Sequence, residues 1–312
     1  PDLWDASRND HTMAIETQDV LTMITIVVPV YNDPEGIATT LESLLTQTTG
    51  DYSIAVVDND STDRTPEVVR SYEKDHDHLT LYHETEIQSS YAARNIGIRN
   101  TDNDILAFFD ADMTVSDGWL DRVLNEFRDV DYLGCNVELT LPEDTLVGRY
   151  NVRTGFPVKQ YLEEQHYAPT CALLVRRGVF EDVGSFDSRL ISGGDREFGE
   201  RVHEAGYEQG YAEDAVVYHP ARTSFNSLAK KNIRIGRGFC QKQQYYPERY
   251  GKPGIPPRPS GPSGKNEDEL DTVTTRLAFA CLSIVMLACR GIGYYYEFVF
   301  GERRDDIPGP TS

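Results

Sequence analysis

Acidic residues follow three apolar runs in this sequence, at points where strands are expected to end. The three segments are Pro29–Asp33, Asp58–Thr62 and Asp110–Asp112. A nucleotide, a divalent metal ion and a sugar all need oxygen ligands, and carboxylates beyond a buried strand supply them. Three acidic strand ends seldom coincide by chance, so we expect them to share one ligand site.

The elements that carry these segments alternate between strand and helix. Ile24–Val30 is a β-branched run typical of a central strand that is covered on both faces. Apolar residues at a spacing of three to four predict a helix over Glu35–Gln47, and a second strand follows at Tyr52–Val57. The pattern continues with a helix after Ser61–Thr65, a strand near Leu79–His83, a helix over Ala92–Asn100 and a strand at Ile105–Phe109.

This alternation predicts the α/β class, with a single doubly wound, mainly parallel sheet flanked by helices. In such a sheet the ligand lies beyond the carboxyl ends of the strands, where the acidic segments are. From about Val130 the pattern is more mixed. We expect short strands near Gly134–Leu139, Thr170–Val175 and Ala215–Tyr218, and a helix over Glu197–Ala205.

The charge balance is strongly acidic. Asp and Glu total 51 against 30 Lys and Arg, which gives a formal net charge of -21, and only 7 of these cations are lysines. A lysine-poor acidic surface is typical of proteins from multimolar salt, where the Debye length falls to about 3 Å. An acidic protein from a mesophile is the alternative. Either origin disfavours a surface that binds nucleic acid.

Two features indicate a cytoplasmic protein. The five cysteines are widely spaced and include no C-x-x-C pair, which fits a reducing compartment better than a zinc or disulfide framework. Residues 1–22 are polar and acidic and lack the pattern of a secretory signal peptide. We interpret them as an N-terminal extension, and Met23 is a candidate native start.

Five segments closely resemble family 2 glycosyltransferases of the GT-A fold. They are IVVPVYND, VVDNDSTDRT, AARNIGI, FFDADM and VGSFDSRLISGGDREFGERVHEAGY, which together span roughly Ile24 to Tyr218. The resemblance implies transfer of a sugar from a nucleoside-diphosphate donor, with UDP favoured, and Mn²⁺ or Mg²⁺ as cofactor. On this basis residues 23–129 form the donor-nucleotide half and residues 130–246 the acceptor half of one domain.

The resemblance implies donor-binding roles for residues at all three strand ends. The aspartate after the second strand binds the base in this family, and the turn after the first strand flanks it. For Asp60 and Thr62, ordinary turn chemistry is the alternative. An arginine of AARNIGI lies beside the donor, where a cationic fork suits diphosphate oxygens. The implied residues are Val30, Tyr31, Asp33, Asp58, Arg94, Asp110, Ala111 and Asp112.

The segment Asp110–Asp112 matches the DxD signature of the family, which holds the ribose and a divalent ion on the diphosphate. The resemblance implies Asp112 and His219 as metal ligands, although His219 also reads as a residue that simply ends a strand. Arg222 is a candidate for binding the phosphates of the donor or the acceptor. Arg234 and Arg237 are similar candidates.

Asp195, in the GGDREF segment, resembles the general base of the family. A carboxylate near the acceptor hydroxyl lets that oxygen attack the anomeric carbon opposite the leaving nucleotide, which inverts the anomer. Gly194 stands where the family often has a second acidic residue, which puts supporting contacts in doubt. The alternative for Asp195 is a helix N-cap, and Glu197 is the fallback base.

The C-terminal segment is hydrophobic. Residues 247–266 form a Pro- and Gly-rich linker, and residues 267–312 follow it. Leu277–Cys289 is almost free of polar residues but is shorter than the roughly 20 residues that cross a bilayer. We favour a helix on the inner membrane surface, with a true span and a helix packed on the protein as alternatives.

Two functions are therefore open. The first is an inverting transferase that moves a hexose or hexuronic acid to a lipid-linked saccharide, which resembles haloarchaeal enzymes that build N-glycans or surface polysaccharides on dolichyl phosphate. The second is a non-catalytic nucleotide-sugar-binding scaffold, against which the intact Asp110, Asp112 and Asp195 argue. A nucleotide-dependent oxidoreductase is disfavoured because G-x-G-x-x-G does not follow the first strand.

Overall fold

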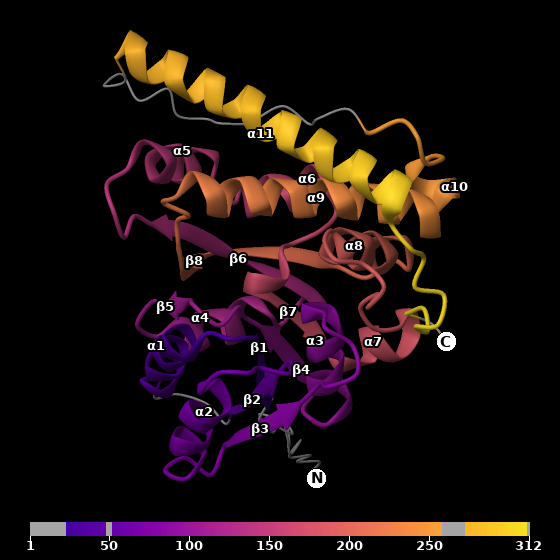
Figure 1. The fold of residues 1–312 in the computed structure, drawn as a ribbon. Coiled ribbons are helices and arrows are strands. Elements are labelled where there is room, and N and C mark those ends of the chain that lie inside the picture. Colours follow the sequence, from indigo (N-terminus) through magenta and orange to yellow (C-terminus); the bar gives the residue numbers. More distant parts are fainter. Residues whose placement is uncertain (1–22, 48–51, 258–271, 311–312) are drawn as a thin grey trace, which may run out of the picture.

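The computed structural model describes residues 23–47, 52–257 and 272–310, which are built on one eight-stranded sheet (Figure 1). The strand order is β3-β2-β1-β4-β7-β6-β8-β5. The strands are β1 (Ile24–Val30), β2 (Tyr52–Asp58), β3 (Leu79–His83), β4 (Ile105–Phe108), β5 (Thr114–Val115), β6 (Tyr132–Thr140), β7 (Leu173–Arg176) and β8 (Gln209–Pro220).

Helices flank this sheet, as the alternation predicts. Figure 1 shows α9 and α11 stacked beyond β6 and β8, at the end of the molecule opposite α2. The helices are α1 (Pro34–Leu45), α2 (Thr65–Glu73), α3 (Ser90–Arg99), α4 (Trp119–Glu126), α5 (Leu146–Thr154), α6 (Val158–Gln165), α7 (Arg177–Val183), α8 (Gly194–Glu204), α9 (Phe225–Tyr245), α10 (Pro247–Tyr250) and α11 (Val273–Phe300).

The parallel half of the sheet brings the acidic strand ends together. Strands β3, β2, β1 and β4 are parallel, and all seven residues of β1 are buried because both of its faces are covered. The register pairs Val30 with Asp58 on one side of β1, and Val27 with Phe108 on the other. The three acidic segments therefore leave the sheet at the same edge.

The other half of the sheet is mixed. Strand β7 is antiparallel to both β4 and β6, β6 and β8 are parallel, and β5 is antiparallel to β8. The mainly parallel α/β fold is thus confirmed, and each antiparallel pair includes a strand that follows Val130. Strand–helix alternation is lost in the same region of the sequence, which is why the topology there could not be predicted.

Helix α9 has 21 residues and was not among the predicted elements. It begins at Ser224, whose side chain accepts a hydrogen bond from the backbone N–H of Ser227. Many of its buried residues are polar or glycine, so the helix lacks the apolar stripe that a sequence pattern detects. The buried residues are Leu228, Asn232, Gly236, Gly238, Cys240, Gln241, Lys242 and Gln243.

Helix α11 packs parallel to α9 along its C-terminal half. A Cβ added at Gly236 would lie 1.9 Å from the carbonyl oxygen of Arg290, and one at Gly293 would lie 2.0 Å from that of Ile233. The backbones of the two helices are therefore in direct contact. Glu297, which is 1% exposed, receives hydrogen bonds of 2.7 Å from Arg237 and from the side chain of Gln241.

The opposite face of α11 is apolar and exposed. Among the described residues, α11 is long and apolar enough to cross a membrane by its length and composition. It has 28 residues, so the helix extends beyond both ends of the apolar run Leu277–Cys289 and is long enough to span. One face of α11 packs on the protein, which was one of the three alternatives for this segment. Residues 1–22 and residues 258–266 of the linker lie outside the described residues.

Candidate active site

Hydrogen bonds tie the first acidic turn to the second. The backbone N–H of Asn32 donates to the Ser61 hydroxyl at 2.9 Å, and the Asn32 side chain accepts from the backbone N–H of Thr62 at 2.8 Å. Asp33 donates its backbone N–H to Thr65 at 3.0 Å. Thr62 is therefore part of the turn itself, in agreement with the alternative of turn chemistry.

Asp58 presents a carboxylate oxygen that has no partner. Its side chain is almost fully buried, and Oδ2 accepts from the backbone N–H of Ser61 at 3.3 Å and lies 3.4 Å from Nδ1 of His83. Oδ1 is buried and has no hydrogen-bond partner among the described residues. A buried acceptor without a donor is costly, so Oδ1 is suited to receive an N–H from a ligand.

A pocket of about 380 Å³ opens beside this turn. Val30 and Tyr31 line it, and Tyr31 keeps 49% of its surface exposed. Two strand ends and the start of α3 thus surround one cavity with an exposed aromatic ring. The lining residues are Pro29, Val30, Tyr31, Asn59, Gln88, Ser89, Ser90, Ile191 and Arg234.

Arg94 connects α3 to the third acidic strand end. Its Nη2 donates to Oδ1 of Asp110 at 2.5 Å, and its Nη1 donates to the carbonyl of Ser90 at 3.3 Å. The residue is 2% exposed, and its Nε has no partner among the described residues. Arg94 is therefore a buried arginine held against the third acidic segment, and not an exposed residue of the helix surface.

Three carboxylates gather at this edge. Asp33 caps the start of α1, accepting from the backbone N–H of Gly36 at 3.0 Å, and burial raises its pKa. A Cβ at Gly36 would touch both Asp33 and the carbonyl of Ala111, which fixes these residues as neighbours. Burial also raises the pKa of Asp112, as do the charges of Asp110 and Asp33. Accumulated negative charge of this kind suits a bound cation.

His219 lies within electrostatic range of Asp112. Its Nδ1 is 2.9 Å from the carbonyl oxygen of Pro220, so Nδ1 is the donor in this contact, and in a neutral ring Nε2 then carries the lone pair. Its ring stacks on Phe156 with centroids 5.7 Å apart. Within the described residues no group of three or more His, Cys, Asp or Glu could hold a metal alone. The possible metal donors at this edge are the carboxylates of Asp33, Asp110 and Asp112 and the ring of His219.

Asp195 lies in the first turn of α8 and is not its N-cap. The N-cap is Gly193, whose φ of 80° is left-handed and favours glycine. Oδ1 of Asp195 accepts from the backbone N–H of Arg196 at 2.9 Å. Burial raises the pKa of Asp195, whereas that hydrogen bond and the charges of Lys242 and Arg94 lower it. Arg94 thus lies within electrostatic range of both Asp110 and Asp195.

Glu197 is not placed to act as a base. It is fully buried on α8 and receives two hydrogen bonds from Arg201, at 2.7 and 3.0 Å. Burial raises its pKa, and its charge is compensated by that arginine. The fallback assignment is therefore disfavoured, because the carboxylate is committed to holding α8.

The family model "Glycosyl transferase family 2" matches residues 25–184. The chain belongs to glycosyltransferase family 2. It is 40% identical over 226 residues to the glycosyltransferase AglE of Haloferax volcanii, covering 71% of this chain and 74% of that protein. It is 29% identical over 236 residues to a pre-mycofactocin glycosyltransferase of Mycobacterium tuberculosis, covering 72% and 48%. The resemblance to family 2 and to a haloarchaeal member is confirmed.

Solved structures agree on the fold of this family 2 chain. The mannosyltransferase PcManGT of Pyrobaculum calidifontis, in complex with GDP-Man and Mn²⁺, has a TM-score of 0.56 at 20% identity. That match covers 89% of this chain and 76% of the other. TarS of S. aureus has a TM-score of 0.51 at 16% identity, over 88% and 55%. The expected GT-A architecture is confirmed.

Sequence reasoning missed residues that support the family motifs. Tyr91 directly precedes AARNIGI, and its hydroxyl accepts from the backbone N–H groups of Gly194 at 2.9 Å and Asp195 at 3.4 Å. Lys242 is buried, within electrostatic range of Asp195, with its Nζ 4.8 Å from the ring centre of Tyr250. Tyr91 could have been found from its place beside the motif. Lys242 carries no such signal, because α9 was not predicted.

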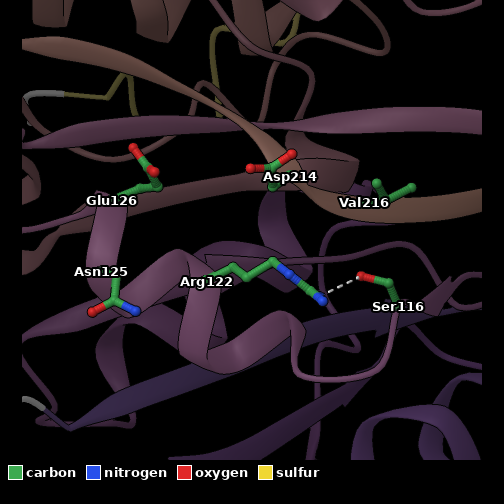
Figure 2. Close-up of a pocket in the computed structure, with 6 residues that line it drawn as sticks. All are labelled: Ser116, Arg122, Asn125, Glu126, Asp214 and Val216. Atoms are coloured by element: carbon green, nitrogen blue, oxygen red, sulfur yellow. Dashed lines mark hydrogen bonds between the residues drawn. The ribbon is translucent and has the colours of Figure 1, made fainter.

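A second pocket, of about 400 Å³, lies between α4 and β8 and contains none of the predicted site residues. Figure 2 shows Arg122 of α4 extended toward Ser116, to which it donates at 3.2 Å. The cavity is open to solvent, and its arginine is already satisfied by the surrounding loop. We assign no role in sugar transfer to it. Its lining residues are Ser116, Arg122, Asn125, Glu126, Asp214 and Val216.

Proposed function

We propose that this family 2 enzyme is an inverting, metal-dependent glycosyltransferase that moves a hexose or hexuronic acid from a UDP-sugar to a lipid-linked saccharide. The observation that carries the proposal is the position of Arg94, which donates to Asp110 and lies within electrostatic range of Asp195. A donor-side carboxylate and a candidate base thus lie on either side of one buried arginine. A transfer reaction needs this proximity of donor and acceptor.

The nucleotide is proposed to occupy the pocket lined by Val30 and Tyr31. The free Oδ1 of Asp58 would accept an N–H of the base, and the exposed ring of Tyr31 would lie against it. Arg94 and Asp110 would fix the ribose and diphosphate. An uracil and a guanine both offer such an N–H, so UDP is the donor implied by the resemblance rather than by Asp58 alone.

Asp112 and Nε2 of His219 are proposed to hold the divalent ion. When bound, Mn²⁺ or Mg²⁺ supplies electrostatic stabilisation of the charge that develops on the departing diphosphate. Two features support this assignment: the three crowded carboxylates, and the histidine tautomer that leaves Nε2 free. PcManGT, a neighbour in fold, was solved with Mn²⁺.

Asp195 is proposed to take the proton of the acceptor hydroxyl. The hydroxyl oxygen then bonds to the anomeric carbon while the bond from that carbon to the diphosphate oxygen breaks, so the anomer is inverted. The raised pKa of Asp195 makes it a stronger base than an exposed aspartate. Gly194 leaves room for Tyr91, whose ring would lie 2.8 Å from a Cβ at that position. The missing second acid is thus replaced by a tyrosine contact.

Helix α11 is proposed to lie on the cytoplasmic face of a membrane. Glu297 and Tyr294 are buried against α9, so a helix that left α9 to cross the bilayer would expose a carboxylate that is now paired. The exposed apolar residues occupy the other face, which suits the boundary between headgroups and acyl chains. They include Val273, Leu277, Ile284, Leu287, Ile292, Val299 and Phe300.

A donor panel tests the proposal. Purified protein in high salt with Mn²⁺ is incubated with UDP- and GDP-sugars, with and without a lipid-linked saccharide, and free nucleoside diphosphate is measured. We expect release from one donor that requires acceptor and is abolished by Asp112→Ala, by Asp195→Ala and by chelation of the metal. Binding without turnover across the panel would favour the scaffold, and equal turnover in both variants would overturn the site.

A further inference from the structure

Three cationic side chains border the candidate site without any carboxylate partner. Arg222 follows β8, and Lys231 and Arg234 belong to α9. In the part of the chain that the structure describes, no carboxylate oxygen lies within 4.0 Å of any of the three. Other cations nearby are satisfied: Arg237 pairs with Glu297 at 2.7 Å, and Arg290 donates to Asn232 at 2.7 Å.

These three residues lie near residues from both the donor side and the acceptor side of the proposed site. Arg222 is half-buried, and the negative charges of Asp112 and Asp110 act to raise its pKa. Lys231 places its Nζ 4.8 Å from the ring centre of Phe156, the ring on which His219 stacks. Arg234 lines the proposed nucleotide pocket and also lies within electrostatic range of Asp195.

The cations repel one another. Burial, together with the charges of Arg222, Arg234 and Arg290, lowers the pKa of Lys231 to about 8. Burial and Arg234 likewise lower the pKa of Arg222. Such repulsion is unfavourable unless an anion enters the group. The chain has 51 acidic residues against 30 Lys and Arg, yet none of the described ones pairs with these three. An abundance of carboxylates and a lack of pairing together indicate an anion that arrives with a ligand.

We propose that Arg222, Lys231 and Arg234 form a binding site for a substrate phosphate, with Lys231 as the residue that no motif identifies. The inference rests on the proposed function, which supplies two sources of this chemistry: the diphosphate of the nucleotide donor, and the phosphate that joins an acceptor saccharide to its lipid. Two guanidinium groups offer paired N–H donors to phosphate oxygens, and the lysine adds a point charge. Arg237, which the sequence grouped with Arg234, is excluded because Glu297 holds it.

Binding measurements test the site independently of turnover. At one fixed salt concentration, calorimetry compares UDP with uridine, and farnesyl phosphate with farnesol in detergent. The proteins are the wild type, Arg222→Gln, Lys231→Met and Arg234→Gln, with Lys230→Met as control because Lys230 is the exposed neighbour of Lys231 on α9. Thermal melting checks that each variant is folded. We expect each site variant to weaken one phosphate ligand by at least about tenfold and to leave its dephosphorylated partner unchanged.

The two arms identify the source of the phosphate. Loss of UDP affinity alone assigns the cations to the donor diphosphate, and loss of farnesyl phosphate affinity alone assigns them to the acceptor. Wild-type affinity for both ligands in all three variants would overturn the inference. A wild type that binds phosphate ligands through these residues but turns over no donor would instead refute the proposed function and leave this site in place.

Discussion

The hydroxyl of Tyr91 accepts the backbone N–H of Gly194 at 2.9 Å and so joins the first turn of α3 to the first turn of α8. The same hydroxyl is 3.4 Å from the backbone nitrogen of Asp195. Helix α3 also carries Arg94, which holds Asp110. One helix therefore fixes the proposed base relative to the donor side of the cleft, through two side chains three residues apart.

Removing this hydroxyl should displace Asp195 without touching either substrate. In Tyr91→Phe the backbone N–H of Gly194 loses its acceptor, and we expect kcat to fall by about tenfold to a hundredfold while the donor KM changes little. Steady-state kinetics at saturating acceptor measure the split. A rise in donor KM with unchanged kcat would show that Tyr91 acts on nucleotide binding instead.

The pH dependence of kcat should report the environment of Asp195. Burial raises its pKa, so the carboxyl is protonated, and inactive as a base, at a pH where an exposed aspartate is still ionised. We expect activity to fall as the pH drops through this raised pKa. Lys242 favours the carboxylate, so Lys242→Met should raise the pKa of Asp195 further and move the acid limb to higher pH.

Lys242→Arg serves as the matched variant for this pH prediction, because it keeps a positive charge at the same position of α9. It should retain an acid limb close to that of the wild type. Both kcat profiles are measured at constant ionic strength, since the interaction is electrostatic. An unshifted limb in Lys242→Met would mean that the lysine stabilises the helix and does not tune the base.

The unpaired Oδ1 of Asp58 gives a separate prediction for the nucleotide. Asp58→Asn keeps the size of the side chain but can present an N–H where the base needs an acceptor. We expect the donor Kd and KM to rise by at least about tenfold, with kcat largely retained, because contacts to the base are the same in ground and transition states. Asp60→Asn, in the same turn, is the control and should behave as the wild type.

The strand ends could be predicted from sequence because each follows a buried β-branched or aromatic run and a parallel sheet brings such ends together. The register of β1 with β2 and β4 then determines the site at Asp58 and Asp110–Asp112. The acceptor side of the site could be predicted less well from the sequence. Helix α9 buries glutamine, asparagine and lysine rather than an apolar stripe, so its residues could be listed as candidates but not separated. The structure separates them, because Arg237 is held by Glu297 whereas Arg234 lines the pocket.

The exposed face of α11 should bind membranes. Leu277 and Ile284 keep 63% and 69% of their surface exposed. Replacing both with Glu should abolish flotation with liposomes that resemble the native lipids, because two charges would have to enter the apolar boundary. Met23→Glu, directly before β1, removes an exposed apolar side chain elsewhere and should leave flotation unchanged. Retained binding of the double variant would point to another surface.

The seam between α9 and α11 gives the last prediction, and the chain offers a matched control for it. Gly236→Ala places a methyl group 1.9 Å from the backbone carbonyl of Arg290, so one helix must move and the Glu297 contacts must loosen. Overpacking of this kind costs about 1–3 kcal/mol, which lowers the Tm by several degrees in a chain of this size.

In Gly291→Ala, on the outer face of α11, the methyl group would meet no described heavy atom within 4 Å beyond its own helix. That variant should be unchanged or slightly more stable, since alanine favours a helix over glycine by about 0.8–1 kcal/mol. Calorimetric melting of the two variants compares them directly, and an equal Tm would mean that α11 is only loosely held on α9. Because α9 carries Arg234 and Lys242, a loosened seam in Gly236→Ala should also weaken nucleotide binding below the melting transition.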